Sequence, residues 1–215
     1  ALTSRLSEVV KVGDVEFLPF CIGSMRETRT FLIGRNPTAS SLYRLNSRYS
    51  GYTNPTYIGQ APLSEVHAVE REVLVELMPL DEICTPAGDY PAPDYRSMDV
   101  EGAEFEILRG AERVLSTSVV WLESEMWFNP VYQDAATIST NLEHLSNKGF
   151  DTFKVEPINN YEGDALSYGM HGEGLTFAAE VSVHKRLEQV LAGADIDRNG
   201  TLLKLYKLAL LAVLN

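Results

Sequence analysis

Positive charge is scarce in this 215-residue sequence. Eighteen Lys and Arg residues stand against 30 Asp and Glu residues, which gives a formal net charge of −12 at pH 7. Such a chain repels a phosphate backbone unless basic residues cluster locally, so we expect no nucleic-acid partner. With 45% hydrophobic and 22% charged residues, the composition otherwise matches a globular protein that has one well-buried core.

Cysteines and long apolar runs are also rare. Cys21 and Cys84 are far apart and lack a Cys-x-x-Cys spacing, so they predict no zinc site and no disulfide framework, and we interpret both as buried free thiols. The first ten residues, ALTSRLSEVV, lack the pattern of a signal peptide, which makes the cytoplasm the expected location. The most apolar segment, 201–215, is shorter than the roughly 20 residues that span a membrane, so we expect no transmembrane segment.

Strand-like and helix-like segments alternate along most of the chain. Helical spacing of apolar residues marks 2–10, 102–115 and 135–148. Strand patterns mark 15–20, 30–33, 73–77, 95–98, 119–123, 150–155 and 175–181. This alternation is typical of an α/β fold with a mostly parallel sheet and helices on both faces. Residues 34–62, rich in Ser, Asn, Gly, Pro and Tyr, predict a loop or lid.

The C-terminal residues predict a helical extension, so we divide the chain into a domain at 1–183 and an extension at 184–215. The apolar segment 201–215 is expected to pack on the domain, on a partner chain or second copy, or on a membrane surface. The turn at 195–200 matches the start of an EF-hand calcium loop. However, Tyr206 stands where the loop needs a bidentate glutamate, so an Asp-rich turn is favoured and no metal site is predicted.

The most informative segment is YRSMDVEGAEFEILRGA, at 95–111. A strand ends in Asp99, a tight turn follows, and the next helix begins with acidic residues that complement the helix dipole. Carboxylates at the C-terminal end of strands in an open α/β sheet face the crevice where ligands bind. Asp99 either takes part in such a site or only caps the helix, and the motif by itself leaves both interpretations open.

This segment resembles the signature of FkbM-type S-adenosylmethionine-dependent methyltransferases, in which a strand runs into Asp-Val-Glu-Gly-Ala-Glu and then a helix with Leu-Lys/Arg-Gly-Ala. The match runs without a gap over 99–111, and the flanking stretches PLDEI, VVWLE and KGF are similar to further elements of that family. The resemblance covers about 15–181. It implies a class I, Rossmann-like methyltransferase fold, S-adenosylmethionine as cofactor, and methyl transfer to a hydroxyl of a sugar, glycolipid or natural product.

The sequence departs from the family pattern in two places. Ser97 stands where the family usually has a lysine. The glycine-rich cofactor loop and the acidic residue that ends the second strand are not in the sequence, and the glycines of 169–174 lie near the wrong strand to replace them. The first two strands of this fold lie between the third and fourth, so we expect a gap in the sheet. A longer natural protein is the favoured explanation; otherwise another chain fills the gap or the third strand pairs differently.

Methyl transfer to a hydroxyl needs aligned reactants and a base that takes the proton. The resemblance makes Asp99 and Glu101 the first catalytic candidates and Glu123, at the end of the next strand, the third. Each carboxylate has a structural or helix-capping alternative. Cofactor contacts are expected from Asp99 and from Gly23 and Ser24, which follow the third strand.

Contacts to the substrate are expected from five residues: Arg44, Arg48, Tyr49, Trp127 and His171. Residues 28–63 contain no acidic residue but four arginines and several tyrosines. Tyrosine suits contact with sugar rings and arginine suits anionic groups, which predicts a loop that closes over an anionic acceptor. Alternatively, these arginines pair with acidic residues elsewhere in the chain.

Two functions therefore remain open. The first is an O-methyltransferase domain that acts on a small-molecule or glycan acceptor. The second is a catalytically silent, methyltransferase-like module that binds a partner or glycan through the same edge of the sheet.

Overall fold

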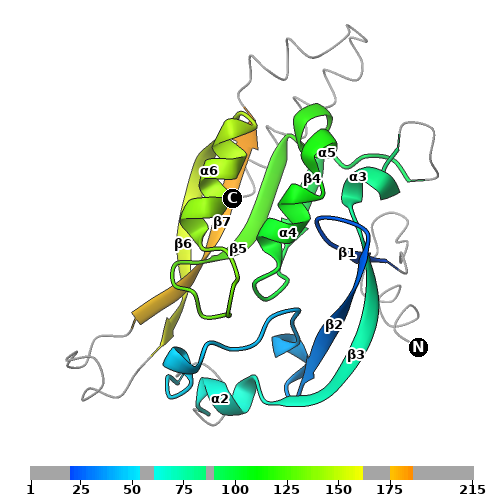
Figure 1. The fold of residues 1–215 in the computed structure, drawn as a ribbon. Coiled ribbons are helices and arrows are strands. Elements are labelled where there is room, and N and C mark those ends of the chain that lie inside the picture. The colour runs from blue at the N-terminus through cyan, green and yellow to red at the C-terminus, as the bar shows by residue number, and fades with distance from the viewer. Residues whose placement is uncertain (1–19, 54–60, 86–89, 162–174, 186–215) are drawn as a thin grey trace, which may run out of the picture.

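The computed structural model describes residues 20–53, 61–85, 90–161 and 175–185, which form two β-sheets with helices and loops around them (Figure 1). The predicted helix at 2–10 and the Asp-rich turn at 195–200 lie outside the described residues. So does most of the predicted C-terminal extension. The α/β character predicted from the sequence is confirmed.

The larger sheet has four strands in the order β4-β5-β7-β6. Their bounds are β4 Tyr95–Met98, β5 Trp121–Trp127, β6 Phe150–Tyr161 and β7 Leu175–Lys185. β4 and β5 run parallel, whereas β7 is antiparallel to both β5 and β6. The sequence predicted β4 with the observed bounds, but it ended the other three strands too early. β7 continues two residues past the predicted domain boundary at 183.

The smaller sheet has three strands in the order β1-β3-β2. They are β1 Cys21–Ile22, β2 Glu27–Gly34 and β3 Val69–Met78. β3 is parallel to β1 and antiparallel to β2. Of the predicted strand at 15–20, only Phe20 is described; β1 follows it directly and pairs with β3, while β4 lies at the edge of the four strands described in the larger sheet. The explanations for the expected gap in the sheet stay predictions.

Both sheets are therefore mixed, which corrects the prediction of a mostly parallel sheet. That prediction assumed that each helix-like stretch is a crossover between neighbouring parallel strands. β2 and β3 are instead joined by an irregular loop, and β7 enters between β5 and β6 in the opposite direction. Antiparallel strands need no helical crossover, so the alternation of elements did not reveal them.

Three helices lie on one side of the larger sheet (Figure 1): α4 Glu104–Arg109, α5 Glu112–Thr117 and α6 Ile138–Asn147. The predicted helix at 102–115 is thus two short helices, separated at Gly110 and Ala111. Apolar side chains of these helices meet the inward side chains of the sheet in one core, where Leu122 and Met126 are fully buried. Helices on the second face of the sheet stay a prediction.

The side chains of β5 alternate between the two faces of the sheet, as in any strand. Leu122 and Met126 join the core beneath the helices, whereas Glu123 and Glu125, at the odd-numbered positions, are only partly buried. The acidic residues of β5 therefore lie on the face away from α4 and α6.

The predicted loop after β2 is tied down at several points in its described part, 35–53. Leu32 and Ser41 exchange two backbone hydrogen bonds. Further along, Asn46 donates to the carbonyl of Val131, and Gln133 donates to that of Arg44. Two 3₁₀ turns, η1 Pro37–Ala39 and η2 Ser47–Tyr49, shape this segment, and the short helix α2 Leu63–Val66 leads into β3. The loop is thus fixed against the segment that follows β5.

Two further predictions concern the cysteines and membrane-spanning helices. Cys84 is buried, as expected, whereas Cys21 is exposed, which corrects its assignment to the core; both are free thiols. Cys21 lies in the two-residue strand β1, at the start of the described chain. Within the described ranges, no helix has the length and apolar character needed to cross a membrane.

The smaller sheet contacts the helical layer through two glycines. A Cβ atom on Gly110, at the end of α4, would lie 2.0 Å from the carbonyl oxygen of Gly23, which follows β1. Next to this contact, α3 Leu80–Ile83 begins where the backbone N–H of Asp81 donates to the carbonyl of Gly110. Because backbone meets backbone here, no side-chain movement can make room for a methyl group.

We therefore expect Gly110→Ala to lower the free energy of unfolding by about 1–3 kcal/mol, as overpacking in a core does. Denaturant unfolding followed by circular dichroism measures this change. Gly51→Ala is the matched control, because a Cβ on Gly51 has no neighbour within 4 Å. Equal free energies of unfolding for the two variants would contradict the close backbone contact between the end of α4 and the smaller sheet.

Candidate functional site

The turn that follows β4 has an unusual backbone. Glu101 has a φ of 52° and Gly102 a φ of 96°. A non-glycine residue in the left-handed region is uncommon and is held there by its surroundings. Gly102 could not carry a side chain, because its Cβ would lie 2.9 Å from the ring of Tyr132. The glycine of the Asp-Val-Glu-Gly motif thus lets Tyr132 lie directly on the turn.

Tyr132 holds the side chain of Glu101. Its hydroxyl donates a hydrogen bond to Oε2 of Glu101 and lies 3.5 Å from Nδ1 of His67. The Tyr132 ring is 1% exposed and meets His67 and Trp127 edge to face, with ring centroids 5.4 and 5.2 Å apart. From the other side, the hydroxyl of Ser41 donates to the backbone carbonyl of Glu101 at 2.6 Å. Glu101 is therefore fixed through both its side chain and its backbone.

Three carboxyl groups meet at this edge of the sheet: Asp99, Glu101 and Glu125, which we call the acid cluster. One oxygen from each lies within 4.8 Å of the others. The register of β4 and β5 explains why, because Met98 pairs with Ser124 and the next residues of the two strands are Asp99 and Glu125. These oxygens could hold a divalent cation, a role that the sequence did not predict.

Crowding and burial raise the pKa of two members of the acid cluster. The pKa of Glu125 rises to about 9, first through burial and then through the nearby charges of Glu101 and Asp99 and a hydrogen bond with Asp99. Its Oε2 is buried without a hydrogen-bond partner among the described residues. Burial also raises the pKa of Glu101 to about 7, although the hydrogen bond from Tyr132 lowers it. Near neutral pH, Glu125 is therefore protonated and Glu101 exchanges a proton readily.

The acidic first turn of α4 has structural roles. Glu104 is 1% exposed, and its Oε1 accepts hydrogen bonds from the backbone N–H groups of Val100 and Gly102, both at 3.3 Å. Glu106 accepts from Ser24 at 2.9 Å, and from Arg29 and Tyr43 at 2.6 Å each. Burial would raise the pKa of Glu106, but these hydrogen bonds together lower it. Glu106 thus ties the smaller sheet and the loop to α4.

The predicted catalytic residues separate in the structure. Asp99 and Glu101 lie in the acid cluster, whereas Glu123 is one strand repeat away. Glu123 accepts hydrogen bonds from the hydroxyl of Tyr95 at 2.6 Å and from Nε1 of Trp121 at 3.2 Å. The role of Glu123 in catalysis stays a prediction.

The predicted cofactor residues Gly23 and Ser24 make their contacts within the protein. The N–H of Gly23 donates to the carbonyl of Met78, and the hydroxyl of Ser24 donates to Glu106. The described residues include no glycine-rich loop beside them. Their contact with a cofactor stays a prediction, and by themselves the described residues do not form a complete S-adenosylmethionine site.

Most of the predicted substrate residues also have protein partners. Arg44 pairs with Glu72 at 2.5 Å. The guanidinium of Arg48 lies 5.7 Å from the centre of the Tyr49 ring, and Tyr49 itself is buried. Trp127 is buried against Tyr132. His171 lies outside the described residues, and substrate contact by all five residues stays a prediction.

Three residues of the site were missed from the sequence. Glu125 was not among the predicted site residues, because the strand was expected to end at Glu123, but β5 runs on to Trp127. Tyr132 lies in a segment without helix or strand spacing, and nothing in its neighbours marks it. His67, next to Tyr132, was not among the predicted site residues either. Only Glu125 could have been found from the sequence, because the apolar residues Met126 and Trp127 indicate that the strand continues past Glu123.

The raised pKa of Glu125 predicts pH-dependent stability. The folded protein holds a proton up to about pH 9 that the unfolded chain releases near 4.5, so the free energy of unfolding falls as the pH rises between these values. Glu125→Gln should therefore be more stable than the wild type at pH 8, by on the order of 2 kcal/mol, and the difference should shrink toward pH 5.

Urea unfolding at several pH values, in buffer with a chelator, measures this difference. Glu143→Gln, which replaces an exposed glutamate of α6, is the matched control and should follow the wild-type curve. A Glu125→Gln variant that is no more stable than the wild type at pH 8 would contradict the buried, protonated state.

Comparison with known proteins agrees with the motif. Residues 7–169 match the family model described as the Methyltransferase FkbM domain. No curated protein and no solved structure was found to match the chain. The family match covers well over half of the 215 residues and includes the turn, α4 and both parallel strands of the larger sheet. The chain therefore belongs to the FkbM methyltransferase domain family.

Proposed function

We propose that this domain serves S-adenosylmethionine-dependent methyl transfer to a hydroxyl group, with Glu101 as the base. The observation that carries the proposal is a single carboxyl group at the C-terminal edge of β4 that is held by Tyr132 and has a pKa of about 7. A general base works best when its pKa lies near the working pH. The family supports methyl transfer, and the acceptor hydroxyl is our inference.

The chain's own residues would handle the proton of the acceptor. The cofactor supplies the methyl group, and the hydroxyl of the acceptor gives up its proton as the new bond forms. Glu101 takes that proton, and Tyr132 keeps its carboxylate in one orientation before the transfer. Asp99, the exposed member of the acid cluster, is then available to orient the acceptor or the cofactor.

Glu125 has a different part in this proposal. Because its pKa is about 9, it carries a proton at neutral pH and is not a base. As a protonated acid it shares a hydrogen bond with Asp99. Within the acid cluster, Glu101 is thus the proton acceptor and Glu125 the protonated acid.

One observation favours the alternative function, a catalytically silent binding module. Gly23 and Ser24 are engaged with Met78 and Glu106, so neither is free to meet a cofactor in the described arrangement. Titration calorimetry with S-adenosylmethionine separates the two functions. Failure of the protein to bind the cofactor in any form would favour the binding module, because a methyltransferase must bind it.

In a form of the protein shown to bind S-adenosylmethionine, we expect Glu101→Gln and Asp99→Asn to lower methyl transfer. The loss of a positioned base typically costs ~10²–10⁴-fold in rate, and we expect the larger loss for Glu101→Gln. Transfer of a radiolabelled methyl group to hydroxyl acceptors measures the rate, and thermal unfolding checks the fold.

Glu143→Gln again serves as the control and should retain full activity, because Glu143 is exposed on α6 away from the acid cluster. Unchanged transfer by both acid variants, at unchanged melting temperature, would leave Asp99 and Glu101 as structural residues of the turn.

A further inference from the structure

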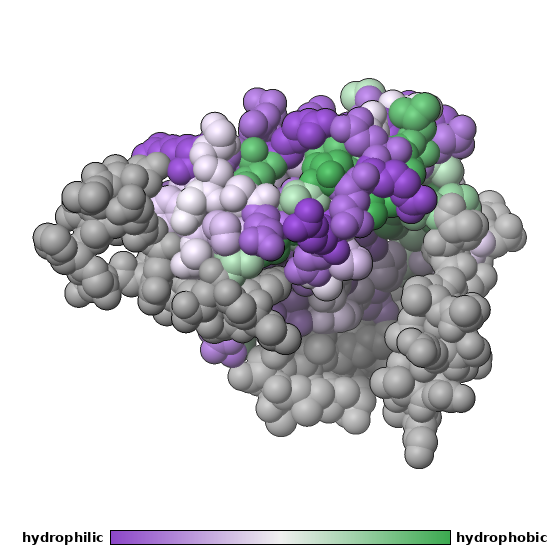
Figure 2. All heavy atoms as spheres, turned by 90° about the horizontal axis from the view of Figure 1, so that it is seen from below, coloured by the Kyte–Doolittle hydropathy of each residue, from purple (hydrophilic) through white to green (hydrophobic). Residues whose placement is uncertain are grey.

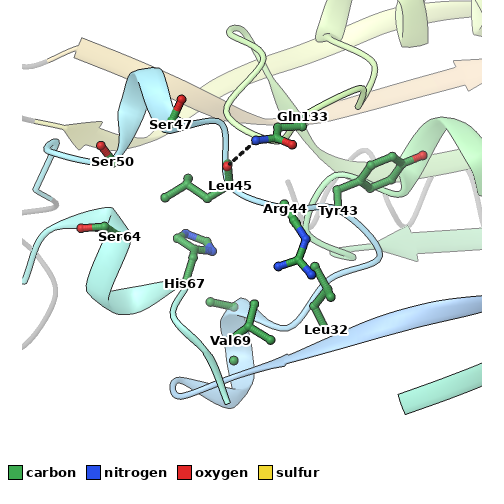
Figure 3. Close-up of a pocket in the computed structure, with 12 residues that line it drawn as sticks. Leu32, Tyr43, Arg44, Leu45, Ser47, Ser50, Ser64, His67, Val69 and Gln133 are labelled. Atoms are coloured by element: carbon green, nitrogen blue, oxygen red, sulfur yellow. Dashed lines mark hydrogen bonds between the residues drawn. The ribbon is translucent and has the colours of Figure 1, made fainter. Parts of the chain in front are cut away.

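A cavity lies next to His67, the neighbour of Tyr132. It has a volume of about 250 Å³ and is formed by β2, the loop after it, α2 and Gln133 (Figure 3). Three serines, Ser47, Ser50 and Ser64, line it together with His67, and we call it the hydroxyl cavity. In Figure 2, which views the molecule from below Figure 1, hydrophilic residues predominate on the described surface.

The polar groups of this cavity have hydrogen-bonding capacity to spare. Within the described part of the chain, the side-chain hydroxyls of the three serines make no hydrogen bond, although their backbones do: Ser64 N–H donates to the carbonyl of Ser50, and Ser50 N–H to that of Ser47. Gln133 donates through Nε2 to the carbonyl of Leu45, which leaves its side-chain oxygen as an acceptor. Each hydroxyl can both donate and accept, so the lining matches a ligand that does the same.

The charged side chain that lines the cavity already has a partner of opposite charge. Arg44 is its one permanently charged residue, and Glu72 pairs with it at 2.5 Å. His67 is held neutral, because burial lowers its pKa to about 4. Figure 3 shows the His67 ring reaching into the cavity, with Ser64 and Ser50 on one side and the Arg44 guanidinium on the other. An anionic ligand would have to displace Glu72, whereas an uncharged ligand would not.

The remaining walls are apolar. Leu32, Leu45 and Val69 and the ring of Tyr43 provide surfaces without hydrogen-bonding groups next to the serines. Such a combination of apolar walls and a few polar groups is typical of small-ligand sites. The volume of about 250 Å³ is below the usual range of about 300–1,000 Å³ for drug-sized ligands, and it suits a group the size of one sugar ring. A sugar ring has both an apolar C–H face and an edge of hydroxyls.

The hydroxyl cavity is joined to the acid cluster by one short path. His67 lines the cavity, its Nδ1 lies 3.5 Å from the hydroxyl of Tyr132, and that hydroxyl donates to Glu101. Tyr43, another lining residue, donates to Glu106 of α4 at 2.6 Å. A ligand in the cavity is therefore separated from Glu101 by the rings of His67 and Tyr132.

We infer that the hydroxyl cavity binds an uncharged, hydroxyl-rich group the size of one sugar ring through the serine hydroxyls and Gln133, with the His67 ring in its wall.

Ligand-observed saturation-transfer NMR, together with protein-observed NMR of the histidine rings, tests the inference on this chain without any methyl transfer. The probes are methyl α-D-glucopyranoside, methyl α-D-mannopyranoside and methyl α-L-rhamnopyranoside, with glucose 6-phosphate as the anionic comparison. We expect at least one neutral probe to bind, to shift the ring signals of His67, and to bind more tightly than glucose 6-phosphate. The Ser47→Ala/Ser64→Ala double variant should weaken that binding by about tenfold, because two hydrogen bonds are lost.

A Ser139→Ala/Ser146→Ala variant, which removes two exposed serines of α6, is the matched control and should bind as the wild type does. No binding of any neutral probe would overturn the inference, as would tighter binding of glucose 6-phosphate or equal affinity of the two double variants. Because no cofactor takes part, failure of methyl transfer leaves this result unaffected, and failure of binding leaves Glu101 untested.

Discussion

The packing of Tyr132 on the turn after β4 is the interaction on which the site depends. The turn leaves room for the Tyr132 ring only because residue 102 is a glycine, whose Cβ would lie 2.9 Å from that ring. The same contact directs the Tyr132 hydroxyl to Glu101, which has a backbone conformation that few non-glycine residues adopt. The short motif Asp-Val-Glu-Gly thus needs a partner 31 residues further along the chain to form a site.

That distance explains which parts of the site the sequence could predict. Asp99 and Glu101 follow a strand and precede a helix, so local patterns were enough to place them at the edge of the sheet. Glu125 joins them through the register of two parallel strands, which depends on where β5 ends. Tyr132 has no local signal at all, because its role comes from packing against a turn that is remote in sequence.

The fold shows the same division between local and long-range information. Six of the seven described strands and the helices α4, α5 and α6 were predicted, because each depends on the spacing of neighbouring apolar residues, whereas β1, α2 and α3 were not. Strand direction was not, since it depends on pairing between distant segments, as between β5 and β7. The arginines of the acid-free segment illustrate the point for charge: Arg29 pairs with Glu106 and Arg44 with Glu72, both outside that segment. The sequence alone suggested a positive patch, whereas in the structure these two arginines form ion pairs.

The dependence of Glu101 on Tyr132 can be measured directly. The carboxyl ¹³C shifts of the glutamate side chains are followed against pH, with a chelator present, in the wild type and in Tyr132→Phe, and Glu101→Gln identifies the signal. The wild-type signal should titrate near pH 7. In Tyr132→Phe the midpoint should rise, because phenylalanine keeps the packed ring but removes the hydrogen bond that favours the charged carboxylate. The same midpoint in both proteins, with the fold intact, would contradict the account.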